Sequence, residues 1–222
     1  MDIEKVLLAR ENRKSRINKP FQNYLRFEKS CLEAGESLLI EHDYPHRTLL
    51  ERSIVISFVS AIEVYFKDML DLVFKYCDPA WFRKHLKSIH PNKYTISDLV
   101  DMYEQSIHPL ELISFGQSFQ NSDQIETVFS KLNGKPFWSS VLGLRARVKD
   151  RPETEVGWSH EQLDSLKYVF KLRHELVHDP TMKEYFDSSL MENLRRASQL
   201  MLGVDISILS ILQEHKDPEL DE

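Results

Sequence analysis

The stretch Leu172-Arg173-His174-Glu175-Leu176-Val177-His178-Asp179-Pro180 matches two catalytic patterns that belong to different folds. In the first, His174-Glu175-x-x-His178 places two imidazoles four residues apart on a helix, where they can bind zinc while Glu175 acts as a general base. In the second, Arg173 and His178 join a permanent cation to a side chain that titrates near neutral pH. The rest of the sequence has to decide between the two.

The zinc pattern fits its surroundings poorly. Asp179-Pro180 ends the helix directly after His178, because the residue before a proline is pushed out of the helical region, whereas a zinc-binding helix normally continues. Asp179 also places a charge where zinc proteases usually carry an uncharged residue. No strand for aligning a peptide is expected upstream. No third ligand stands out, although Glu192 or Asp187 could be proposed. We therefore expect no metal and no other cofactor at this site.

Hydrophobic periodicity predicts helices along nearly the whole chain. Capping boxes at Ser159-x-x-Gln162 and Ser189-x-x-Glu192 mark the start of two of them. The long helices are expected at Phe21–Glu41, Thr48–Cys77, Ser159–His178 and Ser189–Leu212. Together these segments predict an all-α fold, an antiparallel helical bundle with a mostly helical insertion.

The insertion is expected at residues 80–151, within a single domain that spans residues 1–222. A stretch of that length is expected to be folded, and no alternating strand pattern of useful length occurs in it. Its short helices are predicted at Ala80–Ile89, Ile96–Gln105, Pro109–Phe119, Asp123–Leu132 and Phe137–Val148. A loose N-terminal arm is expected to precede the bundle, and the acidic tail at residues 216–222 is expected to be disordered.

Composition indicates a globular protein of a reducing compartment. Of the 222 residues, 41% are hydrophobic and 29% are charged, with a net charge of −6, so the chain as a whole is not a general binder of nucleic acid. The local basic clusters are interpreted first as solvated helix faces. Cys31 and Cys77 form no CxxC motif and suit the cytoplasm. Neither a signal peptide nor a membrane span is expected, and no membrane partner.

Two charged residues are predicted to lie on apolar helix faces. On a helical wheel, Arg173 falls in the middle of the apolar arc of its helix, and Glu63 lies outside the polar stripe of the second long helix. Neither charge is readily buried alone, so the two are predicted to pair across the bundle. A purely structural salt bridge that fixes helix register is the alternative to a catalytic role for Arg173.

His178 is about 140° away from Arg173 on an ideal helix. The two converge only if the helix end frays or if two protomers pair around a twofold axis; otherwise His178 is a surface or capping residue.

The segment Arg173–Asp179 resembles the R-x4-6-H motif of the HEPN superfamily, whose members are small helical proteins that are often ribonucleases. Residues 57–67, Ser-Phe-Val-Ser-Ala-Ile-Glu-Val-Tyr-Phe-Lys, resemble the earlier core helix of that family, with Glu63 as its acidic residue. The order of acidic helix, insertion, motif and final long helix is also similar. The resemblance covers about residues 47–77 and 159–212, and is closest to HEPN nucleases of toxin–antitoxin and anti-phage defence systems.

The resemblance implies metal-independent cleavage of RNA by its own 2′-hydroxyl, giving 2′,3′-cyclic phosphate ends. His178 would be the general base or acid, Arg173 would stabilise the phosphorane, His174 would orient the substrate or relay a proton, and Glu63 would hold Arg173. It also implies a homodimer with facing motifs and an antitoxin or other defence-system protein as a partner. The competing interpretation is a non-catalytic HEPN-like module for dimerisation or partner binding.

Overall fold

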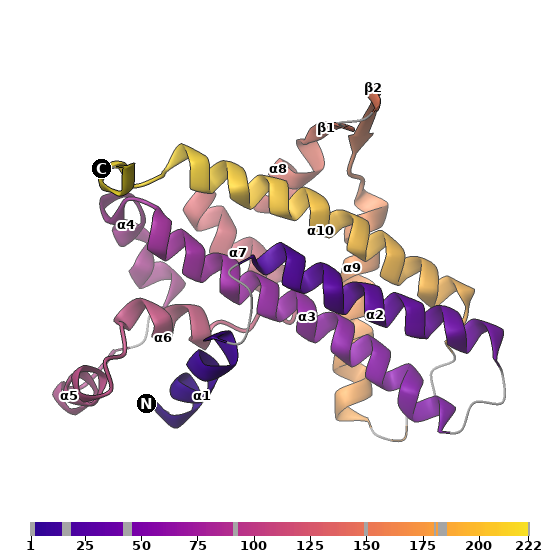
Figure 1. Cartoon of the computed structure of the whole chain (residues 1–222), viewed down its shortest axis with the longest axis horizontal. Coiled ribbons are helices and arrows are strands. Elements are labelled where there is room, and N and C mark those ends of the chain that lie inside the picture. The colour runs from indigo at the N-terminus through magenta and orange to yellow at the C-terminus, as the bar shows by residue number, and fades with distance from the viewer. Residues whose placement is uncertain are drawn as a thin grey trace.

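The computed structural model describes residues 3–14, 19–41, 46–90, 93–148, 151–179, 181 and 186–221. Over these residues the fold is all-α, as the sequence predicts, apart from one two-stranded hairpin (Figure 1). The α-helices are α1 Ile3–Lys14, α2 Pro20–Ile40, α3 Arg47–Tyr76, α4 Pro79–Ile89, α5 Ile96–Glu104, α6 Pro109–Gly116, α7 Ser122–Asn133, α8 Phe137–Gly143, α9 His160–His178 and α10 Ser188–Glu214. The hairpin joins β1 Arg145–Val148 to β2 Arg151–Gly157, and a 3-10 helix, η1, covers Pro218–Asp221.

The four long helices lie within one or two residues of their predicted bounds and enclose the main core. α3 is the central element, because its side chains Phe58, Ile62, Phe66 and Leu70 are fully buried. α2 runs antiparallel to α3 in Figure 1, and α10 lies along the same axis, whereas α9 crosses these helices steeply. The arrangement therefore departs from a simple antiparallel bundle at the helix that carries the motif.

One of the two predicted capping boxes is confirmed. At α9, the Ser159 amide donates to Gln162 Oε1 at 2.9 Å. At α10 the prediction was wrong, because the cap is Asp187, whose Oδ1 accepts from the Leu190 amide at 2.8 Å. The carboxylate starts the helix at Ser188, so Ser189 already lies inside it.

The segment at residues 80–151 contains α4 to α8, whose starts agree with the predicted ones to within a residue. The predicted absence of strands was wrong, because β1 and β2 form an antiparallel hairpin with Ala146 opposite Val156. The helix expected to continue to Val148 ends at Gly143, and α6 ends at Gly116 instead of Phe119. Four residues of alternation are too few to give a strand signal.

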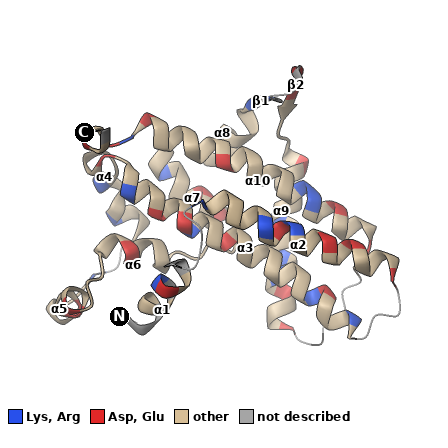
Figure 2. Ribbon diagram, viewed as in Figure 1, with Lys and Arg blue, Asp and Glu red and all other residues tan. Residues whose placement is uncertain are grey.

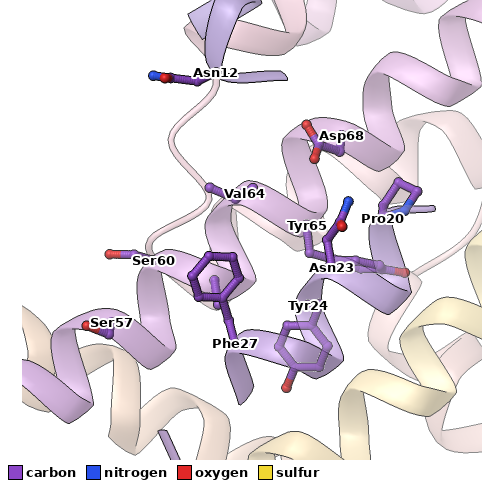
Figure 3. Close-up of a pocket in the computed structure, with 11 residues that line it drawn as sticks. Asn12, Pro20, Asn23, Tyr24, Phe27, Ser57, Ser60, Val64, Tyr65 and Asp68 are labelled. Atoms are coloured by element: carbon purple, nitrogen blue, oxygen red, sulfur yellow. The ribbon is translucent and has the colours of Figure 1, made fainter. Parts of the chain in front are cut away.

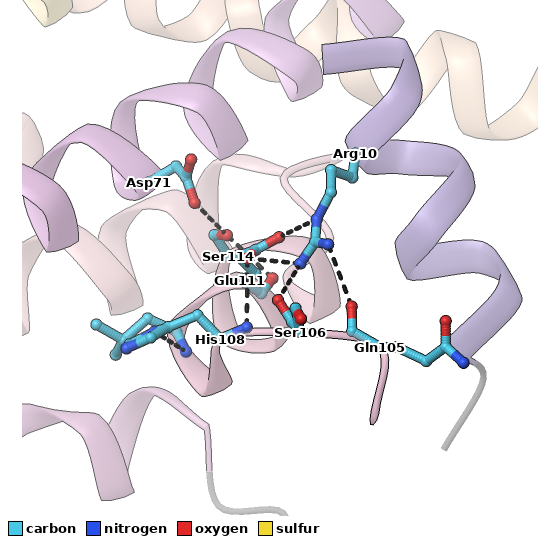
Figure 4. A network of polar contacts seen from close by, with 8 residues as sticks. Arg10, Asp71, Gln105, Ser106, His108, Glu111 and Ser114 are labelled. Carbon is cyan, nitrogen blue, oxygen red and sulfur yellow. Dashed lines mark hydrogen bonds and ion pairs between the residues drawn. The ribbon is translucent and has the colours of Figure 1, made fainter. Parts of the chain in front are cut away.

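The described residues near both chain ends form helical turns that the sequence analysis did not predict. The expected loose arm contains α1, which is held to α6 by the Arg10–Glu111 ion pair, with Arg10 Nη2 2.9 Å from Glu111 Oε1 (Figure 4). The same guanidinium donates to the carbonyls of Gln105 and Ser106. In the acidic tail, the Asp217 amide donates to the Tyr76 carbonyl at 2.9 Å before η1 begins.

Both cysteines are buried as free thiols, and burial raises the pKa of each to about 11. Among the residues that the structure describes, none of the helices combines the length and the hydropathy that crossing a bilayer requires.

Candidate active site

Residues 173–178, which carry the motif, form the C-terminal part of helix α9. Its buried face carries Leu166, Val169, Leu172 and Leu176. Arg173, which the helical wheel places in the middle of the apolar arc, is half-buried. His174 and His178, which follow on the neighbouring face, are exposed. The same helix therefore anchors the guanidinium inside the protein and offers both imidazoles to solvent.

The Arg173 guanidinium is linked to the Glu63 carboxylate through the side-chain amide of Gln120, which lies between α6 and α7. Arg173 Nη1 donates to Gln120 Oε1 at 2.7 Å, and Gln120 Nε2 donates to Glu63 Oε2, also at 2.7 Å. Glu63 also pairs with Lys67 Nζ at 2.9 Å. A side-chain amide can serve a cation and an anion at once, because it carries both an acceptor and donors.

The predicted direct pair between Glu63 and Arg173 is therefore wrong in its geometry. Within the described residues, the ion pair that Glu63 forms is with Lys67, one helical turn along α3. The two charges meet only through the Gln120 amide, as part of the chain Lys67–Glu63–Gln120–Arg173. This network joins three segments that are distant in sequence and fixes Arg173 at the surface of the core.

The Arg173 guanidinium keeps unused hydrogen-bonding capacity. Its Nε is buried and lacks a hydrogen-bond partner among the described residues. A guanidinium has five N–H donors and stays charged at all working pH values. Arg173 is thus held in place by one strong contact and retains donors for an anionic ligand.

The His174 ring is in contact with the His178 ring. The imidazole rings of His174 and His178 lie with their centroids 4.4 Å apart and their planes inclined at 55°. Residues four apart on a helix lie on the same face, which explains this contact. Arg173 is half-buried and His178 is exposed, which agrees with the expected divergence of the two side chains on one helix; the contact that the structure shows is between the two imidazoles.

A polar pocket of about 340 Å³ opens beside Arg173. It is lined by Ser118, Gln120, Asn121, Ser122, Lys167, Phe170, Lys171, Arg173 and His174. Three of these side chains are cationic, of which Lys167 lies 3.9 Å from Asp164 and Lys171 lies 3.7 Å from Glu175. Asn121 and Ser122 form the start of α7, where the helix dipole is positive. This combination favours an anion of the size of a phosphate group, and His174, whose ring contacts that of His178, is part of the lining.

Two positioning residues were missed from the sequence. Gln120 lies outside residues 47–77 and 159–212, which carry the resemblance to the HEPN superfamily. Arg52, on α3, caps the end of α9 by donating to the carbonyls of Leu176 and Asp179, the latter at 3.3 Å. Arg52 therefore holds the turn that carries His178, although its position near the start of a long helix gave no signal of this.

Within the described part of the chain, no group of three His, Cys, Asp or Glu side chains is placed to hold a metal ion, so His174 and His178 gain no third ligand there. Comparisons with family models, curated proteins and solved structures found no match to this chain.

Proposed function

We propose that the chain is a metal-independent endoribonuclease whose active site consists of Arg173, His174 and His178, supported by Glu63. The observation that carries the proposal is the continuous arrangement of these groups. The guanidinium of Arg173 and the His174 ring share one cationic pocket, and the His178 ring lies 4.4 Å from that of His174. A fixed cation beside two exposed imidazoles is the set of groups that phosphodiester transesterification requires.

In the proposed reaction, one imidazole removes the proton from the ribose 2′-hydroxyl, and the oxygen attacks the adjacent phosphorus. The other imidazole, in its protonated form, donates its proton to the departing 5′-oxygen. The products are a 2′,3′-cyclic phosphate and a 5′-hydroxyl. Histidine suits both roles because its unperturbed pKa lies near neutral pH.

Arg173 would stabilise the negative charge that builds up on the phosphorane oxygens. A preorganised cation contributes most when it need not move during the reaction. The Gln120 bridge to Glu63 provides that fixed position, and Lys67 offsets the carboxylate charge. Lys167 and Lys171 extend the positive potential along the RNA backbone.

The test is cleavage of total cellular, transfer and ribosomal RNA by the purified chain in excess EDTA. We expect cleavage to persist in EDTA and to produce 2′,3′-cyclic phosphate ends. The variants His178→Ala and Arg173→Ala should each lose at least about 100-fold in rate, the scale of a lost acid–base or charge-stabilising group.

The matched control is His160→Ala, which removes an exposed histidine at the opposite end of the same helix. It should cleave like the wild type, which excludes a contaminating nuclease as the source of differences. Absence of cleavage on all three RNA classes would favour the non-catalytic module. Loss of cleavage in EDTA would favour a metal-dependent reaction.

A ribonuclease of this kind would act as a toxin or defence effector in the cytoplasm. Its unrestrained expression should slow growth of the host cell, whereas His178→Ala expressed to the same level should not. A protein partner that suppresses this toxicity would then be the expected antitoxin.

A further inference from the structure

We propose that helix α4 binds the phosphate backbone of single-stranded RNA, at a second site that α7 joins to the Arg173 pocket. The inference rests on the proposed ribonuclease function and concerns the part of the substrate that does not react. It assigns to α4 the affinity for a long RNA, whereas the Arg173 pocket holds the phosphate that is cleaved.

Helix α4 carries a cluster of cations on one side. Arg83, Lys84 and Lys87 are exposed, and Lys87 lies four residues after Arg83 and three after Lys84, so the three side chains are neighbours on the helix surface. No residue of α4 is acidic (Figure 2). The helix therefore presents positive charge to solvent without a compensating carboxylate of its own.

These cations are not neutralised by other elements. Several cations on other helices are paired with acids: Lys29 Nζ lies 3.6 Å from Glu33 Oε1, and Arg195 Nη2 lies 2.9 Å from Glu36 Oε1. Within the described residues, the three cations of α4 form no ion pair. They have no internal partner to give up when they bind a phosphate, so the full counterion-release term is available to binding.

α7 joins the α4 cluster to the Arg173 pocket. At its start, Asn121 and Ser122 line the pocket. At its end, Lys131 Nζ donates to the carbonyl of Ser88, in the last turn of α4, at 2.7 Å, and adds a fourth cation there. Lys131 lies ten positions after Asn121, which corresponds to about 15 Å along the helix axis. In Figure 1, α7 lies between α4 and α9, and it packs against both.

The surface between the two sites is polar and carries little negative charge. Gln124, Thr127 and Lys131 follow the spacing i, i+3, i+7 and therefore share one face of α7, on which Thr127 is exposed. The carboxylate of Glu126 accepts hydrogen bonds from two backbone amides at the start of α8. Asp123 is the other acid of α7 and lies in its first turn. An RNA strand that follows this face meets amide and hydroxyl groups before it reaches α4.

The pocket between α2 and α3 has the opposite character. Its volume is about 400 Å³, close to that of the Arg173 pocket. Asp68 lies at the opposite end of this pocket from Ser57 (Figure 3), and none of the described residues that line it is a Lys or an Arg. A carboxylate in a largely apolar pocket repels a phosphate. Charge therefore places the RNA on the side of α9, α7 and α4.

The contribution of α4 follows from the number of phosphates that it neutralises. For single strands, each contact contributes about 0.7 to the slope of log Kd against log salt concentration, so at about 0.1 M salt each contact tightens binding about fivefold. Two contacts from α4 therefore tighten binding about 25-fold. An RNA that is too short to leave the Arg173 pocket gains nothing from them.

The test measures the binding of fluorescein-labelled oligouridine by fluorescence anisotropy. The full-length chain carries His178→Ala, and EDTA is present, so that the RNA is not cleaved. RNAs of about 4 and about 16 nucleotides span the lengths that single-strand sites occupy. In this chain, Arg83→Gln together with Lys87→Gln should raise Kd for the longer RNA about 25-fold and reduce the salt slope by about 1.4. The shorter RNA should bind as before.

Two controls separate a local site from net charge. Lys19→Gln with Arg26→Gln removes the same charge from exposed residues at the start and on the surface of α2, and should change Kd less than about twofold. Arg83→Lys with Lys87→Arg keeps both charges on α4 and should bind like the parent chain. Circular dichroism should show the same helix content for all variants, because every substituted residue is exposed.

Equal affinity of the α4 glutamine variant and its parent for the longer RNA would overturn the proposal, and so would an equal loss in the α2 control. A polyglutamate peptide that displaces the RNA as well as unlabelled oligouridine of the same length does would assign α4 to an acidic protein instead. If the wild type cleaves no RNA while binding still depends on α4, the ribonuclease function fails and the RNA site stands. If cleavage occurs but binding is independent of α4, the reverse holds.

Discussion

Replacing Gln120 with leucine should destabilise the protein by about 3 kcal/mol. The substitution removes two hydrogen bonds to charged groups, each 2.7 Å long and each worth about 1.5–3 kcal/mol. The lower end of that range applies, because Glu63 keeps its ion pair with Lys67 at 2.9 Å and its side chain is 14% exposed. At about 2.1 cal/mol/K per residue, the 222-residue chain has an unfolding entropy of about 0.47 kcal/mol/K. The expected fall in Tm is therefore about 6 °C.

The assay is thermal unfolding followed by circular dichroism, with urea titration to obtain the free energy of unfolding. The matched control is Gln213→Leu, an exposed glutamine on α10, which should change stability by less than about 0.5 kcal/mol. A second variant, Gln120→Glu, keeps the acceptor for Arg173 but turns the donor to Glu63 into a like charge. It should be less stable than the wild type at neutral pH, and should recover as the pH falls and the introduced carboxyl is protonated. If Gln120→Leu lowers Tm no more than the control does, the bridge does not hold Arg173 and the reasoning fails.

Two further predictions concern α10. Gly203→Ala should destabilise the protein by about 1–3 kcal/mol in urea titration, because an added Cβ would lie 2.7 Å from the buried Trp158 ring, whereas Gly143→Ala meets nothing within 4 Å and should be close to neutral. Burial raises the pKa of Asp205, which accepts a hydrogen bond from Tyr65 at 2.8 Å, so the folded state holds this proton to a higher pH than the unfolded state does. The free energy of unfolding should therefore fall as the pH rises just above the ordinary carboxyl range. Asp205→Asn should flatten this part of the profile, and a variant with the same pH dependence as the wild type would contradict the prediction.

The long helices could be predicted because their signals are local and repeated. The apolar stripe of α9 extends from Leu163 to Leu176, and the helix has a capping box at its start and an Asp-Pro pair at its end. The same periodicity placed Arg173 in the middle of the apolar arc, and in the structure this side chain is half-buried. Periodicity gives the face on which a residue lies, so it could identify Arg173 and Glu63 as the two charges in need of partners.

The partners themselves could not be predicted, because they depend on contacts between distant segments. Gln120 is 57 residues from Glu63 and 53 residues from Arg173, and a glutamine in a loop gives no periodic or motif signal. A direct pair was the simplest solution for two opposite charges, and the structure solves the same problem with a neutral amide. Arg52 was missed for the same reason, since its role depends on where α9 ends in space.

The contact between His174 and His178 bears on both interpretations of the motif. A spacing of four residues on a helix brings two imidazoles together, whether they bind zinc or exchange protons, so the histidines alone cannot separate the two. Arg173 can separate them. A guanidinium next to the ligands repels a metal cation, and here three segments of the chain meet to fix one there through Gln120. The phosphoryl chemistry needs that cation, and the lysines of the adjoining pocket strengthen the same preference for an anion. The position of Arg173 therefore favours phosphate chemistry for the motif, and the EDTA experiment tests the same distinction directly.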